Sequence, residues 1–297
     1  MNIDKIKQEK TLSEKDKSLS LIDFAKTKSI KELLEFGILN IDKPADMTSF
    51  DVSDFIRRKL KLRKTSHFGT LDPMVTGVLP IALNRGVKLT GFFLGEDKEY
   101  EGTMRIHKDI SLEEIRKAIS EKFTGKIIQK PPIKSRVKRQ EREREIKLFQ
   151  LLEKKGKDIT FKTEVQGGTY IRKLISDLGE YMGINMHMIA LRRIRAGIFK
   201  VKDSIPLADI ESFDEKTLKG KIIPAEIVSE VYEPVEIKKE VAPKVLHGKP
   251  LFYEDLKENK KFETRKIISV FSENKFIGMF KVVNEGDTFA KPEFVFQ

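Results

Sequence analysis

The chain has 297 residues, and its 58 Lys and Arg against 46 Asp and Glu give a formal net charge of +12. The absence of cysteine excludes disulfides, thiolate catalysis and cysteine-ligated metal centres, and the four histidines are too far apart for a metal-binding motif. No apolar run reaches the ~18 residues of a membrane span, and the charged first residues differ from a signal peptide. We therefore expect a soluble, cytoplasmic protein of one large domain or two, with no metal and no membrane association.

Three segments concentrate the positive charge. Residues 57–64 carry +6, residues 126–147 carry +6 and residues 192–202 carry +5, so the remainder of the chain is acidic, at −5. A single charge run is usually a solvated face. Three such clusters on an acidic background favour a polyanion as partner. Pro131 and Pro132 exclude a basic membrane helix in the second segment, so nucleic acid is preferred over a membrane.

The first half of the chain predicts a peripheral arm followed by a globular region. Residues 1–36 are highly charged, with two apolar clusters, and predict short helical pieces. Residues 38–41 then predict a strand, and Ser49 is placed to be the N-cap of a helix with one apolar face. The apolar run at 78–83 predicts a buried strand, and alternation over residues 100–106 predicts a half-buried one.

The middle of the chain predicts two well-defined helices and a pair of strands. Ser111 to Glu114 form a capping box that opens a helix, with Gly125 at its C′ position. The remaining elements are paired strands at 145–153 and 159–166, and a helix over 171–182 that Gly183 ends. Strands and helices mix without a strict βαβ rhythm, which predicts an α+β fold with a mixed, largely antiparallel sheet and flanking helices.

The C-terminal tail predicts a small all-β barrel. The periodic pattern thins near residues 222–234, and residues 267–271 and 276–283 then form a candidate hairpin. Residues 294–296 predict a last strand. We therefore predict three regions: an arm at 1–36, a main domain at 37–225 and a small domain at 232–297.

The common nucleotide-binding and hydrolase signatures are absent, which leaves carboxylates, tyrosines and arginines as candidate reactive groups. The most informative stretch runs from His67 through Gly69-Thr70-Leu71-Asp72-Pro73. A Gly-x-x-Asp-Pro segment alone is usually only a turn. Its significance therefore depends on the segments around it.

This stretch, followed by residues 76–80, resembles the catalytic motif of the pseudouridine synthases of the tRNA T-loop (TruB) type. Further matching blocks occur in the family's order at 39–44, 98–100, 168–174 and 187–193. Residues 131–144 are similar to the archaeal and eukaryotic guide-RNA-dependent, dyskerin-like branch, and the tail at 276–296 resembles an RNA-binding PUA domain. The resemblance implies the pseudouridine synthase fold over 37–225 and a PUA-like domain over 232–297.

The implied reaction breaks the N1 glycosidic bond of uridine, turns the base and rejoins it through C5. It needs no net redox change or hydrolysis, and hence no cofactor. The family places Asp72 as the catalytic carboxylate, acting on a uridine that is extruded from its stack. A carboxylate in such a site would tend to protonate through desolvation unless a cation holds it ionised, and by resemblance Arg172 is that cation.

The resemblance assigns the remaining site residues around the flipped base. Tyr100 would stack on the base and could move a proton from C5, and His67 would aid the flipped conformation. Walls of the same site are expected from Tyr170 and Leu191, with Lys43 as a support beside it. Each of these residues is also compatible with plain packing or turn chemistry. Phe68 departs from the small residue that the family usually has there.

The basic segment at 126–147 predicts a thumb-like loop and strand that grip the RNA backbone. Its candidate phosphate contacts are Lys134, Arg136, Lys138 and Arg139. A solvated charged hairpin is the alternative.

The favoured hypothesis is an RNA uridine isomerase acting on the T-loop uridine of tRNA, on guide-RNA-selected uridines in rRNA, or on both. In the guide-RNA mode it is the monomeric catalytic subunit of an H/ACA particle with small accessory proteins. A non-catalytic RNA-binding scaffold that kept the fold is one alternative. A glycosidase-like hydrolase is another, but it needs two carboxylates flanking one bond, and only Asp72 lies in a matched motif.

Overall fold

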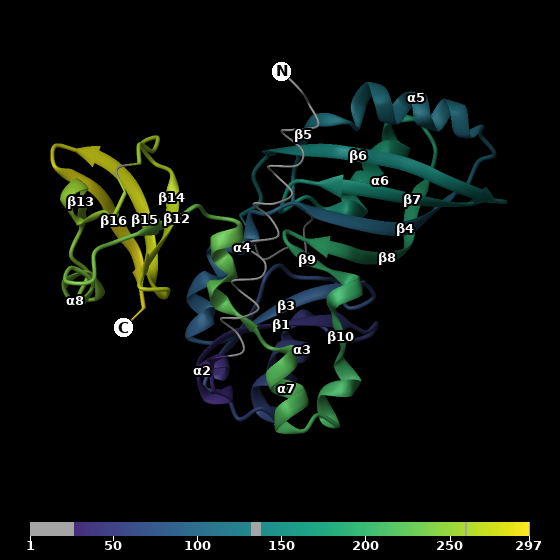
Figure 1. Ribbon diagram of the computed structural model, residues 1–297. Coiled ribbons are helices and arrows are strands. Elements are labelled where there is room, and N and C mark those ends of the chain that lie inside the picture. Colours follow the sequence, from purple (N-terminus) through teal and green to yellow (C-terminus); the bar gives the residue numbers. More distant parts are fainter. Residues whose placement is uncertain (1–26, 132–137, 259, 297) are drawn as a thin grey trace, which may run out of the picture. The chain divides into compact units, whose positions relative to one another are not determined.

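The structure is a computed structural model that describes residues 27–131, 138–258 and 260–296. The chain divides into two compact units, one spanning Ser29–Ile223 and the other formed by the residues from Pro224 onward with Thr27 and Lys28 (Figure 1). The first element of the larger unit is helix α2 (Ile30–Glu35), which Ser29 caps and whose Leu33 packs into the core. The predicted domain boundaries at 37, 225 and 232 stay a prediction.

One mixed sheet, with 11 strands among the described residues, organises the larger unit. Its strands are β1 (Phe36–Lys43), β2 (Thr65–His67), β3 (Thr76–Asn84), β4 (Lys98–Ile106), β5 (Gly125–Gln129), β6 (Arg142–Lys155), β7 (Asp158–Val165), β8 (Met186–Ala196), β9 (Phe199–Lys200), β10 (Ile205–Pro206) and β11 (Ile223–Pro224). The main path runs β10-β1-β3-β8-β4-β7-β6-β5. Along it the β1–β10 and β3–β8 pairs are parallel and the others antiparallel, which confirms the predicted largely antiparallel sheet.

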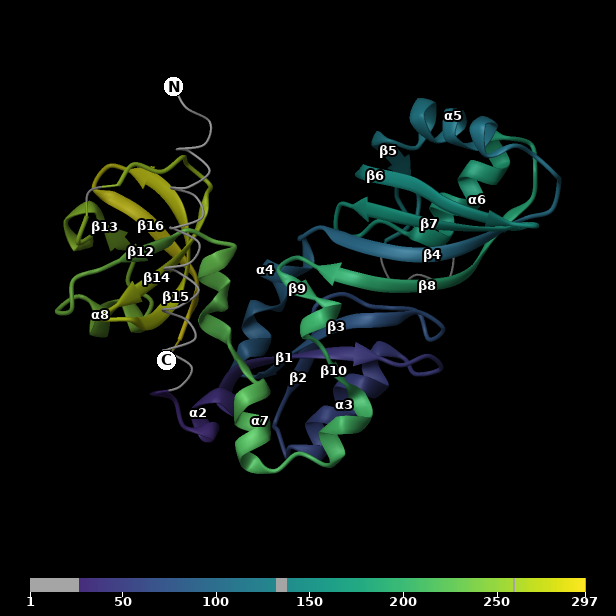
Figure 2. The ribbon, with the colours of Figure 1, turned by 45° about the vertical axis from the view of Figure 1, so that its right-hand side comes forward.

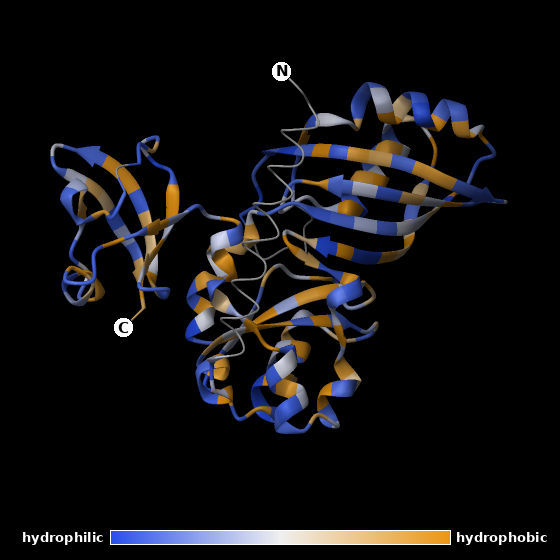
Figure 3. Cartoon of the chain, viewed as in Figure 1, coloured by the Kyte–Doolittle hydropathy of each residue, from blue (hydrophilic) through white to orange (hydrophobic). Residues whose placement is uncertain are grey.

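Helices flank this sheet, of which α3, α5 and α6 are amphipathic. They are α3 (Ser49–Lys59), α4 (Thr90–Leu94), α5 (Leu112–Lys122), α6 (Ile171–Tyr181) and α7 (Glu215–Lys221). Helices α5 and α6 contact each other and pack on β6 and β8 (Figures 1 and 2). Hydrophobic and hydrophilic residues mix along the strands of the sheet (Figure 3). Buried and partly exposed residues alternate along β7, as expected for a strand with one covered face, whereas β1 and β3 are buried along almost their whole length. The predicted helix over 171–182 is α6; Ile171, Leu174, Ile175 and Leu178 lie in the core, and Met182, just after the helix, packs against it.

Two helix boundaries differ from the sequence prediction by one residue. Helix α3 is capped by Thr48 rather than Ser49, because Thr48 Oγ1 accepts from the Asp51 amide at 3.0 Å and the Thr48 amide donates to the Asp51 carboxylate at 2.9 Å. Helix α5 has the predicted capping box at Ser111, but its C-cap is Phe123, so Gly125 lies one residue beyond C′. Gly183 occupies the predicted C′ position of α6 with φ +66°.

The smaller unit contains a five-stranded sheet that curls into a half-barrel (Figure 2). Its order is β12 (Pro234–Glu236), β14 (Ile267–Ser272), β15 (Lys275–Glu285), β16 (Thr288–Val295) and β13 (Leu251–Phe252), with helix α8 (Ala242–Leu246) beside it. The predicted hairpin is confirmed, since Ser272 pairs with Lys275. Glu273 and Asn274 both have positive φ, as a two-residue type I′ turn requires.

Candidate active site

Asp72 lies in the loop that joins β2 to β3. Gly69 opens this loop with φ +112°, a conformation that glycine adopts without strain. The carbonyl of Asp72 accepts from the Val75 amide and the carbonyl of Pro73 accepts from the Asp46 amide, both at 3.0 Å. The backbone at Asp72 and at the residue after it is therefore held by hydrogen bonds.

Arg172, the second residue of α6, forms an ion pair with Asp72. The Arg172 side chain is 58% exposed and the Asp72 side chain 43%. Asp72 is therefore not desolvated in the chain alone, contrary to what the resemblance led us to expect. Exposed pairs contribute only about 0–1 kcal/mol to stability. The pair therefore acts mainly by orienting the Asp72 carboxylate.

Ser49 joins helix α3 to the same loop. Its hydroxyl accepts from the Leu71 amide at 2.8 Å and donates to the Leu71 carbonyl at 3.1 Å. The serine is fully buried. Its side chain thus fixes the peptide groups of the residue directly before Asp72.

Lys43, at the end of β1, supports the loop from the other side. The buried ammonium donates to the carbonyls of Pro44 at 2.7 Å and Pro73 at 2.9 Å. Burial lowers the pKa of Lys43, and nearby carboxylates, Asp72 among them, oppose this shift. Lys43 therefore places a buried positive charge near the Asp72 carboxylate.

Arg193, on β8, is the largest fully buried side chain of the described residues. Its Nε donates to the Val78 carbonyl at 2.7 Å and its Nη2 donates to the Gly69 carbonyl at 3.0 Å. Desolvation lowers the pKa of Arg193, and the hydroxyl of Tyr100, its cross-strand neighbour on β4, opposes the shift. The guanidinium thus connects the start of the Asp72 loop to Tyr100.

A β-bulge brings Arg193 to this position. Tyr100 pairs with Arg193 and Glu99 pairs with Arg195, which leaves Ile194 as an extra residue in β8. Residues 193 and 195 would share one face of a regular strand. The bulge instead turns Arg193 toward the Asp72 loop, while Arg195 binds the Glu99 carboxylate.

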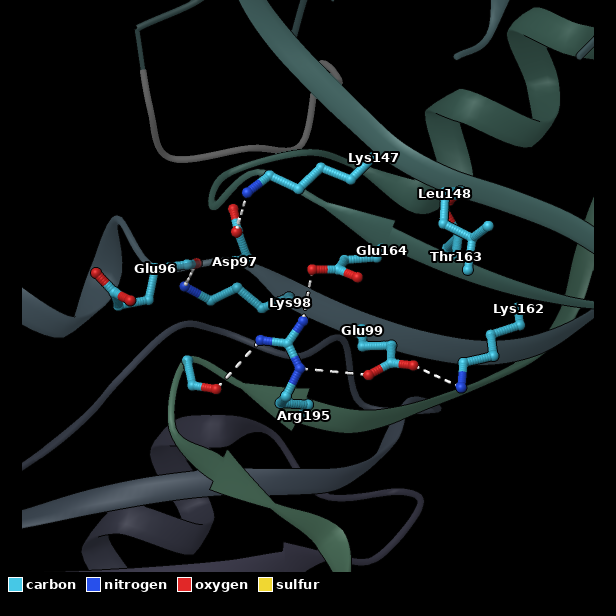
Figure 4. A network of polar contacts seen from close by, with 11 residues as sticks. Glu96, Asp97, Lys98, Glu99, Lys147, Leu148, Lys162, Thr163, Glu164 and Arg195 are labelled. Atoms are coloured by element: carbon cyan, nitrogen blue, oxygen red, sulfur yellow. Dashed lines mark hydrogen bonds and ion pairs between the residues drawn. The ribbon is translucent and has the colours of Figure 1, made fainter. Parts of the chain in front are cut away.

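The arginine network around Arg195 ties three strands together (Figure 4). Its guanidinium contacts Glu99 on β4 at 3.3 Å and Glu164 on β7 at 2.8 Å. Lys162 binds the other oxygen of Glu99 at 2.6 Å. Because Glu99 and Tyr100 are consecutive in β4, these ion pairs lie on the face away from Tyr100 and fix the strands that carry it.

Arg192 makes a second connection beside the loop. Its guanidinium binds the Asp42 carboxylate in a bidentate manner, at 2.6 and 3.0 Å, and lies 3.4 Å from the Thr76 hydroxyl. Asp42, Thr76 and Arg192 belong to β1, β3 and β8. A Cβ at Gly77 would come within 2.2 Å of the Arg193 carbonyl oxygen, so only glycine permits this close approach of β3 to β8.

Two further predicted residues lie on elements that reach the site. Leu191 is buried in the core on β8, opposite Gly102 of β4. Tyr170 immediately precedes α6, and both its amide and its carbonyl are bound by the side chain of Gln129, at 3.0 and 3.2 Å. Gln129 therefore links the end of β5, which lies within the basic segment at 126–147, to the start of the helix that carries Arg172.

His67 ends β2 and is half-buried. Burial, with the nearby charge of Arg193, lowers the pKa of His67, so its ring is neutral at pH 7. The adjacent Phe68 stacks on Phe93 with ring centroids 4.7 Å apart and contacts Phe199 at 5.9 Å. These aromatic rings account for the large residue at position 68.

Lys98 begins β4 and is buried. Its ammonium donates to the carbonyls of Leu94 at 2.7 Å and Glu96 at 2.5 Å. Burial, with the charge of Arg193, lowers the pKa of Lys98 to about 8. Two buried basic side chains therefore lie on the Tyr100 side of the sheet.

The predicted RNA-contacting residues are only partly described. Lys138 and Arg139 are exposed immediately before β6, whereas Lys134 and Arg136 lie outside the described residues. Within the described part of the chain, no group of three or more His, Asp or Glu side chains could hold a metal ion. The same part contains no helix long and apolar enough to cross a membrane.

The structure thus brings Asp72, Arg172 and Lys43 together and connects Tyr100 to them through Arg193. The sequence did not predict the contacts of Arg193 and Gln129, and it predicted Ser49 as a helix cap rather than as a support of the Asp72 loop. The one available signal was that Arg193 falls inside the matched block at 187–193, next to Leu191.

Comparison with known proteins gives concordant results. Residues 57–171 match the N-terminal domain of TruB family pseudouridylate synthases, and residues 172–229 match the C-terminal domain of tRNA pseudouridylate synthase B. The probable tRNA pseudouridine synthase B of Methanocaldococcus jannaschii is 40% identical over 233 residues, covering 76% of this chain and 69% of the relative. The same-named protein of Methanococcus aeolicus is 43% identical over 227 residues, covering 74% and 68%.

Two solved structures share the fold of this chain. A chain in a Cbf5-Nop10-Gar1 complex has a TM-score of 0.84 and 32% identity, covering 92% of this chain and 88% of that chain. A chain in an H/ACA particle bound to a substrate RNA containing 2′-deoxyuridine has a TM-score of 0.82 and 30% identity, covering 92% and 89%. Fold and matches together define a pseudouridine synthase, which is an isomerase. Within that class, the chain belongs to the TruB family of pseudouridylate synthases.

Proposed function

We propose that the chain converts uridine to pseudouridine in folded RNA, at the T-loop uridine of tRNA and at uridines that a guide RNA selects. The observation that carries this proposal is the Asp72–Arg172 ion pair, whose members come from the two matched family domains. Relatives named tRNA pseudouridine synthase B support the tRNA target, and the likeness to Cbf5 in H/ACA complexes supports the guide-RNA target.

In this proposal Asp72 is the catalytic carboxylate, Arg172 orients it through the ion pair, and Lys43 holds the loop that carries it. The uridine enters the site only after it has been flipped out of its stack. The bound RNA then covers the half-exposed ion pair and supplies the desolvation that the chain alone lacks. Electrostatic interactions in the covered site are stronger than in water.

Tyr100 and Leu191 form the wall beside the flipped base, together with Tyr170. In this proposal the Tyr100 hydroxyl exchanges a proton with C5. The buried cations Arg193 and Lys98 on its side of the sheet stabilise negative charge that develops at the base during bond exchange. His67, being neutral, contacts the RNA without adding a charge.

RNA backbone contacts come from the basic segment and from the smaller unit. Lys134, Arg136, Lys138 and Arg139 bind phosphates next to the target. The smaller unit acts as a PUA-like RNA-binding domain, for which it offers a surface hollow lined by Lys244, His247 and Lys249. In the guide-RNA mode the chain works as a monomeric catalytic subunit with small accessory proteins, as the Nop10 and Gar1 complexes of its structural neighbours suggest.

The test is a tritium-release assay on RNA with 5-tritiated uridine. We expect wild-type chain to release tritium from T-loop RNA unaided, and from an rRNA target when guide RNA and accessory proteins are added. Asp72→Ala should release none and still bind RNA within a few-fold of wild type. The control is Asp54→Ala, which removes another ion-paired aspartate, on α3, and should stay active.

Equal release by Asp72→Ala and wild type would refute the catalytic role of Asp72. RNA binding without any release by the wild type, on either substrate, would instead indicate the non-catalytic scaffold.

A further inference from the structure

Ser49 is the first residue of α3, but its buried hydroxyl does not cap the helix. Thr48 performs the capping of α3, and the side chain of Ser49, 1% exposed, points instead to the Asp72 loop. A buried hydroxyl must find partners for its donor and its acceptor. Ser49 finds both in one residue, the backbone of Leu71.

These two bonds restrain the peptide groups on either side of the Leu71 Cα. The amide comes from the Thr70–Leu71 peptide, and the carbonyl belongs to the peptide that leads into Asp72. Leu71 is itself buried in the core, so its side chain anchors the same point. The position of the Asp72 Cα is therefore fixed from the N-terminal side.

Lys43 provides the matching restraint on the C-terminal side, through the Pro73 carbonyl. Asp72 thus lies between two residues whose backbones are each held by a buried side chain. Helix α3 itself is anchored in the core, because its residues Val52 and Ile56 are fully buried.

We propose that Ser49 is a positioning residue for the reaction: it sets the place of the Asp72 carboxylate without touching the RNA. The inference rests on the proposed role of Asp72. A displacement of a catalytic group by about 1 Å can cost about 10²-fold in rate. Loss of the Ser49 hydroxyl removes two hydrogen bonds to the loop while leaving the RNA-contacting side chains in place.

Ser53 supplies a matched control one turn later on α3. It is also buried, at 6% exposure, and its hydroxyl bonds to the Thr65 hydroxyl at 3.0 Å rather than to the Asp72 loop. Ser49→Ala and Ser53→Ala therefore remove the same group from the same helix.

The experiment measures kcat and KM for T-loop RNA, thermal unfolding and the hydrogen exchange of the Leu71 amide in wild type and both variants. We expect Ser49→Ala to lower kcat by 10- to 100-fold with KM within two-fold of wild type, and to speed exchange at Leu71. Ser53→Ala should stay within about three-fold of wild type in kcat, with similar thermal unfolding. Should Ser49→Ala fail to fold, Ser49→Cys, which keeps the size but weakens the hydrogen bonds, is measured by the same criteria.

Equal kcat values for the Ser49 and Ser53 variants, with the wild type active, would overturn the positioning role of Ser49 and leave the proposed function standing. A fall in activity that appears entirely in KM would overturn it as well. An inactive wild type would instead overturn the proposed function on which it rests.

Discussion

The Asp72–Arg172 pair joins side chains that are 100 positions apart in the sequence. Removal of the guanidinium leaves the carboxylate free to rotate in water. We expect Arg172→Ala to lower kcat by about 10²-fold or more, since orientation and electrostatic stabilisation are lost together. Single-turnover tritium release measures the effect.

The neighbouring Lys173 provides the control for that substitution. It pairs with Asp177 within α6, away from the loop. Lys173→Ala should therefore leave single-turnover release near the wild-type rate. If both variants lost activity equally, a general effect on α6 rather than the ion pair would be responsible.

Arg193 and Arg192 are adjacent but should contribute differently to stability. Arg193→Met removes the donor to the buried Val78 carbonyl and to the partly buried Gly69 carbonyl, which we expect to cost about 3 kcal/mol in the free energy of unfolding. Arg192 is partly exposed, so Arg192→Met should cost about 1 kcal/mol. Urea unfolding compares the two, and a larger loss for Arg192→Met would contradict this assignment.

Individual site residues were predictable only where a motif marked them. Asp72, Tyr100 and Arg172 stand in recognisable family blocks, and their proposed roles came from that resemblance. Arg193 could not be assigned a contact, because regular alternation along β8 places it on the same face as Arg195 and only the bulge at Ile194 separates them. The sequence does not distinguish Thr48 from Ser49 as the cap of α3, because both are good N-cap residues.

Among the elements, the turn from α4 into β4 contains a pH-sensitive group. The pKa of Lys98 falls from the ordinary 10.5 to about 8 in the folded chain. Between these two pH values the unfolded state binds more protons than the folded state, so Lys98 makes stability rise with pH. The total gain is of the order of 3 kcal/mol.

Comparison with Lys98→Met isolates this contribution from other groups that titrate at alkaline pH. Urea unfolding of both proteins, at several pH values from 8 to 10.5, should show the stability of the wild type rising relative to that of the variant. A constant or falling difference would show that Lys98 is not desolvated in the folded chain.

Elements with local signals were predicted well, and their long-range pairing was not. The capping box at Ser111 and the C′ glycine at Gly183 identified α5 and α6 directly. The parallel pairing of β3 with β8 joins Thr76 to Arg192, and nothing in either segment specifies the other. That pairing depends on tertiary packing, which local patterns do not encode.

At the scale of the whole molecule, the charge distribution should determine the salt dependence of RNA binding. Lys138→Glu with Arg139→Glu removes two exposed cations beside β6. Binding should weaken, and the slope of log K against log salt should become shallower by about 1.5, because each phosphate contact contributes roughly 0.7–0.9. Filter binding across a salt series measures the slope.

A control with the same charge change is available at the β6–β7 turn. Lys155 and Lys157 are both exposed there, outside the three basic segments. Lys155→Glu with Lys157→Glu should leave the slope nearly unchanged. Identical slopes for the two double variants would mean that only net charge matters and that the basic segment makes no specific contact.

The long sequence distances within the site bear on how the protein is made. Asp42 meets Arg192 across 150 positions, and Gly69 meets Arg193 across 124. Contacts so far apart form slowly, because the loop between them must close first. On the ribosome, the Asp72 loop emerges long before the residues that hold it. The catalytic arrangement is therefore completed late in synthesis, and a nascent chain that ends before β8 carries the motif without the geometry that makes it an enzyme.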